Sequence, residues 1–271
     1  MEQGDRTGFS DVDPSGRIQD LVEYLATAAK ILATSRREAY EMLRLRRGGS
    51  ILDVGCGTGE ACLDLAGQVG AAGRVVGVDA SGGMLAVSQR NAETAGISID
   101  LSQASVYSLP FPDGTFDAVR AERLFQHLRD PESGLRELVR VTRSGGRVMV
   151  VDPDHGQNGI ALDDACHARV FEAAMRALRR MITNPKSGTR MKPMFVRAGL
   201  LSVENRVSAL ELTYPDFVRL LALQQALDSA LDAREVTLEQ SRGFLAELGD
   251  RHSNGTFFGC LIEHRVAGTK P

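Results

Sequence analysis

Three glycines at alternate positions indicate a backbone loop that contacts a ligand. The stretch ILDVGCGTGEA, residues 51–61, places Gly55, Gly57 and Gly59 directly after an apolar run that is typical of a buried strand. Glycine lets a backbone turn tightly and lets a ligand approach without a Cβ atom in the way. A helix expected to begin near Glu60 adds free N–H groups at its first turn. We therefore expect a ligand to lie against this backbone.

A carboxylate follows at the spacing of a ribose-binding residue. The next apolar run, RVVGVDAS, ends in Asp79, about 20 residues beyond the last glycine, as in nucleoside-binding folds. A carboxylate at the end of the second strand can accept hydrogen bonds from both hydroxyls of a ribose. The loop and Asp79 together predict a nucleoside site and disfavour a tight turn that binds nothing.

Two other nucleotide-binding patterns fit this loop less well. A dinucleotide site of the form G-x-G-x-x-G would have its third glycine at position 60, where this chain has Glu60. The Glu60 carboxylate would also crowd a pyrophosphate. A P-loop is excluded because no Gly-Lys-Ser/Thr follows the glycines. The loop therefore departs from both phosphate-binding patterns.

The composition is that of an ordinary globular protein. The chain has 271 residues, 25% charged and 43% hydrophobic, with a formal net charge of −3. No basic excess is present to neutralise phosphates, so we expect no nucleic-acid partner. No apolar run is long enough to span a membrane, and the polar N-terminus does not resemble a secretory signal. Four cysteines without a CxxC pair predict a reduced, cytoplasmic protein.

The periodicity predicts the elements that position the loop. Expected strands lie at 51–54, 75–78, 97–101, 116–120 and 147–151, and expected helices at 60–69, 82–95 and 132–142. This alternation is typical of an α/β fold, a parallel sheet with helices on both faces. Two helices are expected before it, from Ile18 and over 36–45. After it we expect helices at 161–182, 215–231 and 235–248 and strands at 201–208 and 256–266.

Four segments in a fixed order make a family resemblance specific. They are ILDVGCGTG, VVGVDAS, LPFPDGTFDAV and LRELVRVTRSGGRVMVVD. From about Ser50 to Asp152 the chain resembles the class I S-adenosylmethionine-dependent methyltransferases, and among them the small-molecule type of ubiquinone and menaquinone biosynthesis. The resemblance implies a Rossmann-like, seven-stranded, mostly parallel sheet with helices on both faces, and S-adenosyl-L-methionine as cofactor. The pattern of expected elements divides the chain into an N-terminal helical segment (1–49), a cofactor-binding core (50–152) and a remainder of the same fold (153–271) with helical cap insertions at about 153–188 and 209–254.

The resemblance also assigns residues to the two ends of the cofactor. At the methionine end it implies Asp53, Gly55, Cys56, Gly57, Glu122 and Arg123. At the adenosine end it implies Asp79 for the ribose and Ala80 and Met84 for the adenine, although Met84 equally suits an ordinary helix core. Many relatives have an Asp-Ala pair where this chain has Ser105 and Val106, so the contact to the adenine amino group is expected from the Ser105 hydroxyl or from the backbone.

Two residues are candidates for the chemistry itself. His127, in VRAERLFQHLRDP, follows the fourth strand, and histidine is suited to take up a proton near neutral pH. The alternative is a structural histidine at a helix end. Asp152, at the end of the fifth strand, is expected to orient His127 or the acceptor. A metal held by Asp152, Asp154 and His155 is the disfavoured alternative, and we expect no metal.

The cap insertions are expected to hold the acceptor. Arg190, Lys192 and Tyr214 are candidate polar contacts for the acceptor, although each of them is more typical of plain surface or core. The expected function is methyl transfer to a small organic molecule, with oxygen as the favoured acceptor atom. One alternative keeps the cofactor pocket but catalyses a non-methylating step such as a cyclisation. Another, a methyltransferase acting on RNA or protein, is disfavoured by the balanced charge. The oligomeric state stays open.

Overall fold

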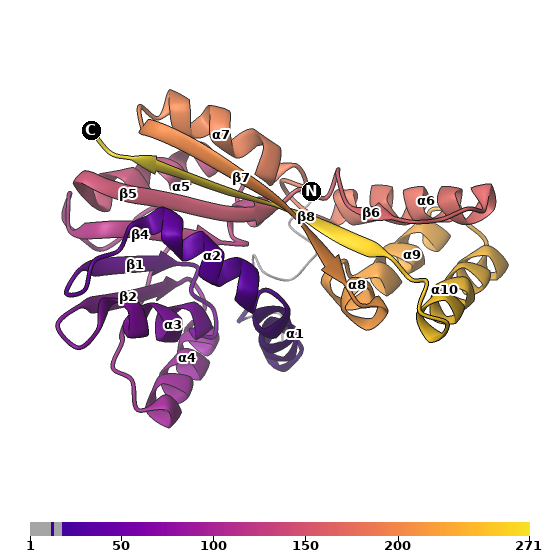
Figure 1. Ribbon diagram of the computed structural model, residues 1–271, viewed down its shortest axis with the longest axis horizontal. Helices are drawn as coiled ribbons and strands as arrows, with labels where there is room; N and C mark the ends of the chain where they lie inside the picture. The colour runs from indigo at the N-terminus through magenta and orange to yellow at the C-terminus, as the bar shows by residue number, and fades with distance from the viewer. Residues whose placement is uncertain (1–11, 14–17) are drawn as a thin grey trace.

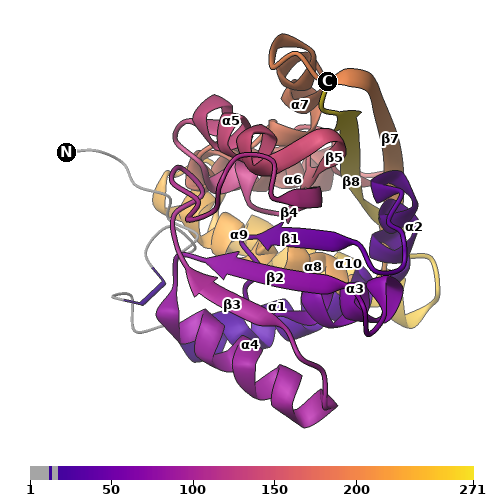
Figure 2. The same cartoon turned by 90° about the vertical axis from the view of Figure 1, so that its left-hand side faces the viewer.

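A single mixed sheet runs the length of the molecule (Figures 1 and 2). The computed structural model describes residues 12–13 and 18–271. The strand order is β3-β2-β1-β4-β5-β8-β6, with β7 beside β8. The strands are β1 (Ser50–Val54), β2 (Arg74–Asp79), β3 (Asp100–Gln103), β4 (Phe116–Glu122), β5 (Thr142–Pro153), β6 (Gly159–Ile160), β7 (Leu201–Leu212) and β8 (Gly259–Thr269). Strands β1 to β5 pair in parallel, and β8 runs antiparallel to its neighbours. The expected Rossmann-like α/β fold is confirmed, with the two-residue β6 as an unexpected addition.

Helices cover both faces of this sheet. They are α1 (Ile18–Ile31), α2 (Ala33–Leu43), α3 (Glu60–Val69), α4 (Gly82–Ala95), α5 (Pro131–Val141), α6 (Ala165–Met181), α7 (Ser187–Arg197), α8 (Tyr214–Leu220), α9 (Leu223–Asp232) and α10 (Leu238–Ser253). Ile51 and Leu52 are adjacent on β1 and point to opposite faces, as successive strand residues do. Ile51 packs in one core with α2 and α3, and Leu52 packs in another with α5 and α7. Burial on both faces explains why these strands are continuously apolar.

The cap is a helical module whose hydrophobic core also includes Ala28 of α1 and the following Leu32. Helices α6, α8, α9 and α10 pack around Phe171, Phe217, Leu227 and Phe244 at the end of the molecule remote from β1 to β3 (Figure 1). The long strands β7 and β8 run from the sheet into this module. No helix in the described part of the chain combines the length and apolar composition that a membrane crossing requires.

Two cap helices differ from the expected ranges for local reasons. The helix expected over 161–182 begins at Ala165, because the Asp164 carboxylate caps it by accepting a hydrogen bond from His167 N (2.8 Å). The single helix expected over 215–231 is broken into α8 and α9 by Ala222, which has a φ of 45°.

Helix α1 lies between the sheet and the cap (Figure 1). It contacts α4 on the sheet side and α8 on the cap side. Arg219 of α8 donates a hydrogen bond from Nη1 to Thr27 Oγ1 of α1 (2.6 Å). The sequence predicts this helix from its apolar stripe, but the periodicity does not show that α1 joins the two parts of the molecule.

Candidate active site

A large cavity opens at the carboxyl ends of β1, β2 and β4. Its volume is about 1260 Å³, and helices α1 and α8 and the last turn of α6 complete its walls. Ligand sites of open α/β sheets lie at this edge. Sites for one small ligand are usually about 300–1,000 Å³, so this cavity has room for two ligands lying against each other.

The three glycines of the loop after β1 have different roles. Gly55 and Gly57 have positive φ values of 74° and 53° and line the cavity. Gly59 (φ 86°) does not line it; a Cβ there would lie 2.1 Å from the Ser88 hydroxyl of α4. Gly55 and Gly57 therefore open the backbone to a ligand, whereas Gly59 permits close packing between the start of α3 and α4.

Asp79 lies at the end of β2 on the cavity wall. Its Oδ2 accepts a hydrogen bond from Gly57 N (2.8 Å) and its Oδ1 from Ser81 N (2.9 Å). These two amides fix the carboxylate, which keeps further lone pairs for a ligand. Desolvation raises the pKa of Asp79, partly offset by these hydrogen bonds. Four other residues expected at the adenosine end line the same cavity: Ala80, Met84, Ser105 and Val106.

Glu122, the last residue of β4, presents an ionised carboxylate to the cavity. Arg36 Nε donates to its Oε2 (2.8 Å), and the fully buried Arg120 also pairs with it. Burial alone would raise the pKa of Glu122, but these two guanidinium groups lower it to about 2. Glu122 lines the cavity, so the site offers a permanent negative charge there.

Asp53 and Cys56, both expected beside the ligand, do not line the cavity. Asp53 is buried under the loop, with its Oδ1 3.2 Å from Arg120 Nη1. It therefore supports the Arg120–Glu122 pair from behind. The Cys56 side chain is turned toward β2, where a Cβ on Gly77 would lie 2.9 Å from Cys56 Sγ. Neither side chain lies on the cavity wall, and contact of these two residues with the cofactor stays a prediction.

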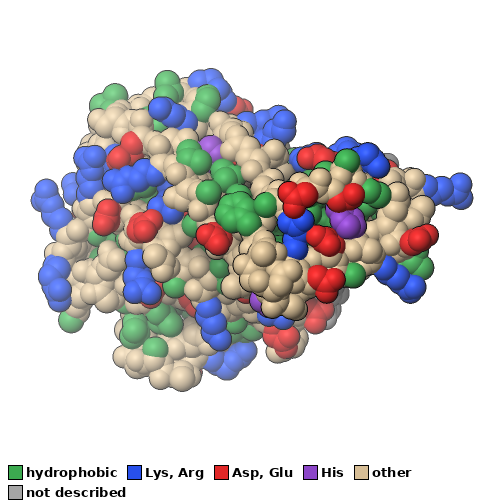
Figure 3. Space-filling model, turned by 45° about the vertical axis from the view of Figure 1, so that its right-hand side comes forward, with side chains coloured by type: hydrophobic (Ala, Val, Ile, Leu, Met, Phe, Trp, Pro, Cys, Tyr) green, Lys and Arg blue, Asp and Glu red, His purple; other side chains and the backbone are tan. Residues whose placement is uncertain are grey.

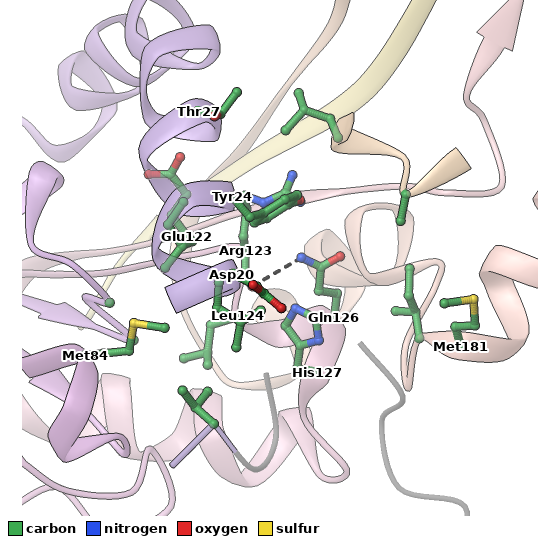
Figure 4. Close-up of a pocket in the computed structure, with 18 of the residues that line it drawn as sticks. Asp20, Tyr24, Thr27, Met84, Glu122, Arg123, Leu124, Gln126, His127 and Met181 are labelled. Carbon is green, nitrogen blue, oxygen red and sulfur yellow. Dashed lines mark hydrogen bonds between the residues drawn. The ribbon is translucent and has the colours of Figure 1, made fainter. Parts of the chain in front are cut away.

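Arg123 begins the loop after β4 in a strained conformation. Its φ of 53° is rare for a residue with a side chain. Arg123 Nη2 donates to the Tyr24 hydroxyl of α1 (2.6 Å), and the guanidinium lies 5.9 Å from the Tyr24 ring centroid. Such strain costs roughly 1–3 kcal/mol and clusters at functional sites. Figure 4 shows Arg123 and Tyr24 together at the cavity.

The two candidate catalytic residues have different surroundings. His127 ends the 3₁₀ helix η1 (Phe125–His127), is half-buried and lines the cavity (Figure 4). Asp152 is fully buried and lies behind the cavity wall, where its Oδ2 accepts a hydrogen bond from Ser187 Oγ (2.5 Å). Desolvation raises the pKa of Asp152 to about 7. The structure therefore brings His127, and not Asp152, to the cavity surface.

A chain of hydrogen bonds leads from the cavity wall into the interior, and the sequence does not predict it. Asn158 Oδ1 accepts from Ile262 N (3.5 Å), so its amide nitrogen faces His155 Nδ1 (3.3 Å). The His155 proton is then on Nε2, which donates to Gln126 Oε1 (3.0 Å), and Gln126 Nε2 donates to Arg123 O (3.2 Å). Burial and nearby positive charges lower the pKa of His155 to about 3, so the imidazole is neutral.

The acidic loop after β5 is occupied by internal contacts. Asp154 Oδ2 accepts from Thr189 Oγ1 (2.6 Å), and Asp152 and His155 are engaged as described above. Within residues 12–13 and 18–271, no three His, Cys, Asp or Glu side chains are arranged to hold a metal ion. Of the candidate polar contacts of the cap, Tyr214 lines the cavity, whereas Arg190 and Lys192 lie on α7 outside it.

The missed cavity residues come mainly from α1 and α8. They include Leu21, Tyr24, Leu25, Val218 and Arg219. No local motif marks the residues of α1 and α8. Only their helical periodicity could have placed them, and that pattern does not distinguish a cavity from a core.

Comparisons with known proteins agree with this fold and indicate the family. Residues 52–150 match the family model described as a methyltransferase domain. Demethylmenaquinone methyltransferase of Thermus thermophilus is 38% identical over 155 residues, which cover 56% of this chain and 68% of that protein. The chain therefore belongs to the class I S-adenosylmethionine-dependent methyltransferases, whose cofactor is S-adenosyl-L-methionine, as its sequence motifs indicate.

Two solved structures extend the comparison to the fold of nearly the whole chain. The YcgJ protein of Bacillus subtilis has a TM-score of 0.59 at 22% identity, covering 88% of this chain and 98% of that one. The [4+2]-cyclase SpnF has a TM-score of 0.56 at 22% identity, covering 88% and 81%. This chain spans 58–68% of the length of the first curated relatives it matches.

Proposed function

We propose that the protein transfers a methyl group from S-adenosyl-L-methionine to an oxygen of a small organic acceptor. The main support is that one cavity extends from Gly57 and Asp79, an end that we call the first chamber, to the lining residues of α6 and α8 under the cap, an end that we call the second chamber. The two parts meet at the loop after β4, which contains Arg123 and His127. In-line displacement requires donor and acceptor to be held in contact and shielded from water, which such a cavity permits.

The residues of the first chamber suit the cofactor. The Asp79 carboxylate, held by two amides, has lone pairs free for the ribose hydroxyls. The ionised Glu122 carboxylate suits the ammonium group of the methionine end. Gly55 and Gly57 let the backbone approach the ligand. When bound, the cofactor supplies a methyl group activated by its sulfonium.

The second chamber suits an acceptor with an apolar body. Leu178 and Met181 of α6, its C-cap residue Ile182 and Val218 of α8 line it, with polar groups gathered at the loop after β4. His127 is placed to take the hydroxyl proton as the oxygen is alkylated, which keeps the acceptor nucleophilic. The histidine imidazole is the general base of this proposal, and Asp152 has no direct contact with the reacting atoms.

The surface supports a small-molecule acceptor over a nucleic acid. On the face shown in Figure 3, basic side chains are interrupted by acidic and apolar ones, without a continuous basic area. The formal net charge of −3 agrees with this distribution. Binding along a phosphate backbone would require a basic track.

The proposed function is tested by following the labelled methyl group. The protein is incubated with S-adenosyl-L-methionine carrying a deuterated methyl group and with fractions of a small-molecule extract. Oxygen methylation is supported if S-adenosylhomocysteine forms together with a labelled small product. The labelled methyl group of that product should be released by reagents that cleave a methyl ether or a methyl ester. Label recovered only in protein or RNA would contradict a small-molecule acceptor. Label recovered on nitrogen or carbon would contradict oxygen as the acceptor atom.

A cyclisation without methyl transfer is the second candidate. It is favoured by the likeness to the [4+2]-cyclase SpnF, which has the same fold over most of this chain. In that case the protein would bind the cofactor, convert an acceptor to an isomer of equal mass, and form no S-adenosylhomocysteine. Measuring S-adenosylhomocysteine against product separates the two functions.

Replacing Asp79 with alanine is expected to weaken cofactor binding by roughly 1.5–3 kcal/mol, the usual contribution of a hydrogen bond to a charged group. The fold should persist because Asp79 is at a strand end and only half-buried. Asp79→Asn keeps one oxygen acceptor, so it should weaken cofactor binding less than Asp79→Ala does. Titration calorimetry with S-adenosylhomocysteine measures both variants, and an unchanged dissociation constant for Asp79→Ala would exclude Asp79 from the site.

The cap segments, 153–188 and 209–254, are expected to gain protection from hydrogen exchange when S-adenosylhomocysteine and acceptor bind. Since the cap helices share one hydrophobic core, we expect them to move as a unit. Protection should rise in α8 and the end of α6, which line the cavity, and stay constant in β1. Equal exchange with and without ligands would show that the cap is a fixed wall.

A further inference from the structure

The dipeptide Val12–Asp13, ahead of α1, lies at the adenosine end of the cavity. Val12 is buried, with 9% of its surface exposed, and lines the cavity. It packs in a small cluster with Leu21 of α1 and Met84 of α4. Met84 is one of the residues assigned above to the adenine. Val12 therefore supplies a wall of the same chamber from a part of the chain far away in sequence.

Asp13 fastens this dipeptide to the turn that follows β2. Its Oδ2 accepts a hydrogen bond from Gly82 N (2.9 Å), and its Oδ1 accepts from Gly83 N (3.2 Å) and from the Ser81 hydroxyl. The Ser81 hydroxyl donates to Asp13, because a carboxylate can only accept, while its oxygen accepts from Met84 N (3.0 Å). One carboxylate therefore receives three hydrogen bonds from consecutive residues.

The same turn holds the ribose-binding carboxylate. The backbone N–H of Ser81 donates to Asp79 Oδ1 (2.9 Å) while its side chain donates to Asp13. Ser81 thus joins the two acids on opposite sides of one turn. The approach is close: a Cβ on Gly83 would lie 2.6 Å from Ile18 Cδ1 and 3.0 Å from Asp13 Oδ1.

Capping of α4 does not by itself account for this arrangement. Ser81 is already the N-cap residue of α4, with its side chain accepting from Met84 N. Asp13 adds hydrogen bonds to Gly82 N and Gly83 N from outside the helix and at the same time places Val12 on the cavity wall.

We propose that Val12 and Asp13 are a further part of the cofactor site, in which Val12 closes the adenine end and the Asp13 carboxylate holds Val12 and the ribose-binding turn in place. This inference rests on the proposed cofactor site. Asp13 is a positioning residue, since it acts through Val12 and Ser81. Its effect should fall on the release of the cofactor, because affinity differences among variants of one site arise mostly in the dissociation rate.

Asp13→Ala is expected to raise the dissociation rate of S-adenosylhomocysteine about tenfold, which corresponds to about 1.4 kcal/mol. The rate is measured with tritium-labelled S-adenosylhomocysteine chased by unlabelled ligand, since the chain has no tryptophan to serve as a fluorescent reporter. Asp13→Asn keeps an oxygen acceptor for the glycine amides and should show a smaller increase.

Asp164→Ala is the matched control. Asp164 is also an exposed aspartate that accepts a hydrogen bond at a helix N-terminus, that of α6, and it does not line the cavity. Loss of either carboxylate should lower the melting temperature, but only Asp13→Ala should speed release. Release from Asp13→Ala within twofold of the wild type, or equal acceleration in Asp164→Ala, would overturn the inference. Failure of the wild type to bind S-adenosylhomocysteine would overturn the proposed function and this inference together.

Discussion

Replacing His127 with alanine is expected to lower the single-turnover rate of methyl transfer about 10²–10⁴-fold, the usual contribution of a general base. The affinity for S-adenosylhomocysteine should change no more than a few-fold. The imidazole lines the cavity at the loop where the two chambers meet, whereas the groups assigned to the cofactor, Asp79 and Glu122, are held by other partners. The measurement is a rapid-quench time course at saturating cofactor, with the acceptor that the labelling experiment identifies.

His167→Ala is the control for this variant. His167 is a histidine of α6 outside the cavity, so its replacement should leave the methyl-transfer rate unchanged. A second readout is the dependence of the rate on pH: loss of a base should remove the ascending limb of the wild-type profile. Full activity of His127→Ala would show that His127 is structural and that the acceptor reacts without a protein base, since Asp152 lies behind the wall.

The cofactor end of the site is largely predictable from sequence because its determinants are local. Gly55 and Gly57 follow a strand directly, and Asp79 ends the next one. In a parallel sheet the carboxyl ends of neighbouring strands meet at one edge. Knowing the element type is then enough to bring these residues together, and the structure places all three at the cavity.

Side-chain direction within the same motif is less predictable. Asp53 and Cys56 lie within three residues of Gly55, yet neither lines the cavity. Their direction depends on Arg120 and Gly77, which are partners on neighbouring strands. A motif gives the order of residues along the chain, but only the register between strands decides which residues lie behind the loop.

The acceptor end depends on contacts that are distant in sequence. Gln126 is oriented by His155, and His155 is oriented by Asn158, which is itself fixed by a backbone N–H of β8. The break between α8 and α9 occurs at Ala222 in a left-handed conformation that alanine disfavours, so local propensity predicts one continuous helix there. Tertiary packing overrides propensity at such positions.

Two buried groups, His155 in the cavity wall and Asp152 behind it, are expected to give opposite pH dependences that nearly cancel in the wild type. Desolvation and the positive charges of Arg123, His127 and Arg179 lower the pKa of His155 from 6.5 to about 3. The unfolded chain therefore binds a proton below pH 6.5 that the folded chain does not, and the free energy of unfolding falls as the pH falls.

Asp152 has the opposite sign. Desolvation raises its pKa from 3.8 to about 7, with Glu122 adding to the rise and Ser187 and Arg123 opposing it. Between about pH 7 and pH 3.8, Asp152 is protonated in the folded chain and ionised in the unfolded chain. The free energy of unfolding therefore rises as the pH falls through this window. Each group contributes about 1.4 kcal/mol per pH unit in the window where only one state is protonated.

Between pH 6.5 and 4.5 the two slopes overlap, and single variants should separate them. His155→Gln removes the falling slope, so its stability should increase relative to the wild type by about 3 kcal/mol as the pH drops across this window. Asp152→Asn removes the rising slope, so its free energy of unfolding should fall by about the same amount relative to the wild type across this pH window. Glu122 lies outside the comparison, because its pKa is lowered from 4.5 to about 2 and its stabilisation is lost only below this range.

Urea unfolding of the three proteins at several pH values measures the slopes, and subtracting the wild-type curve cancels the other titrating groups. Parallel curves for His155→Gln and the wild type would mean that His155 is protonated as readily in the folded protein as in the unfolded chain, in which case the neutral imidazole does not orient Gln126.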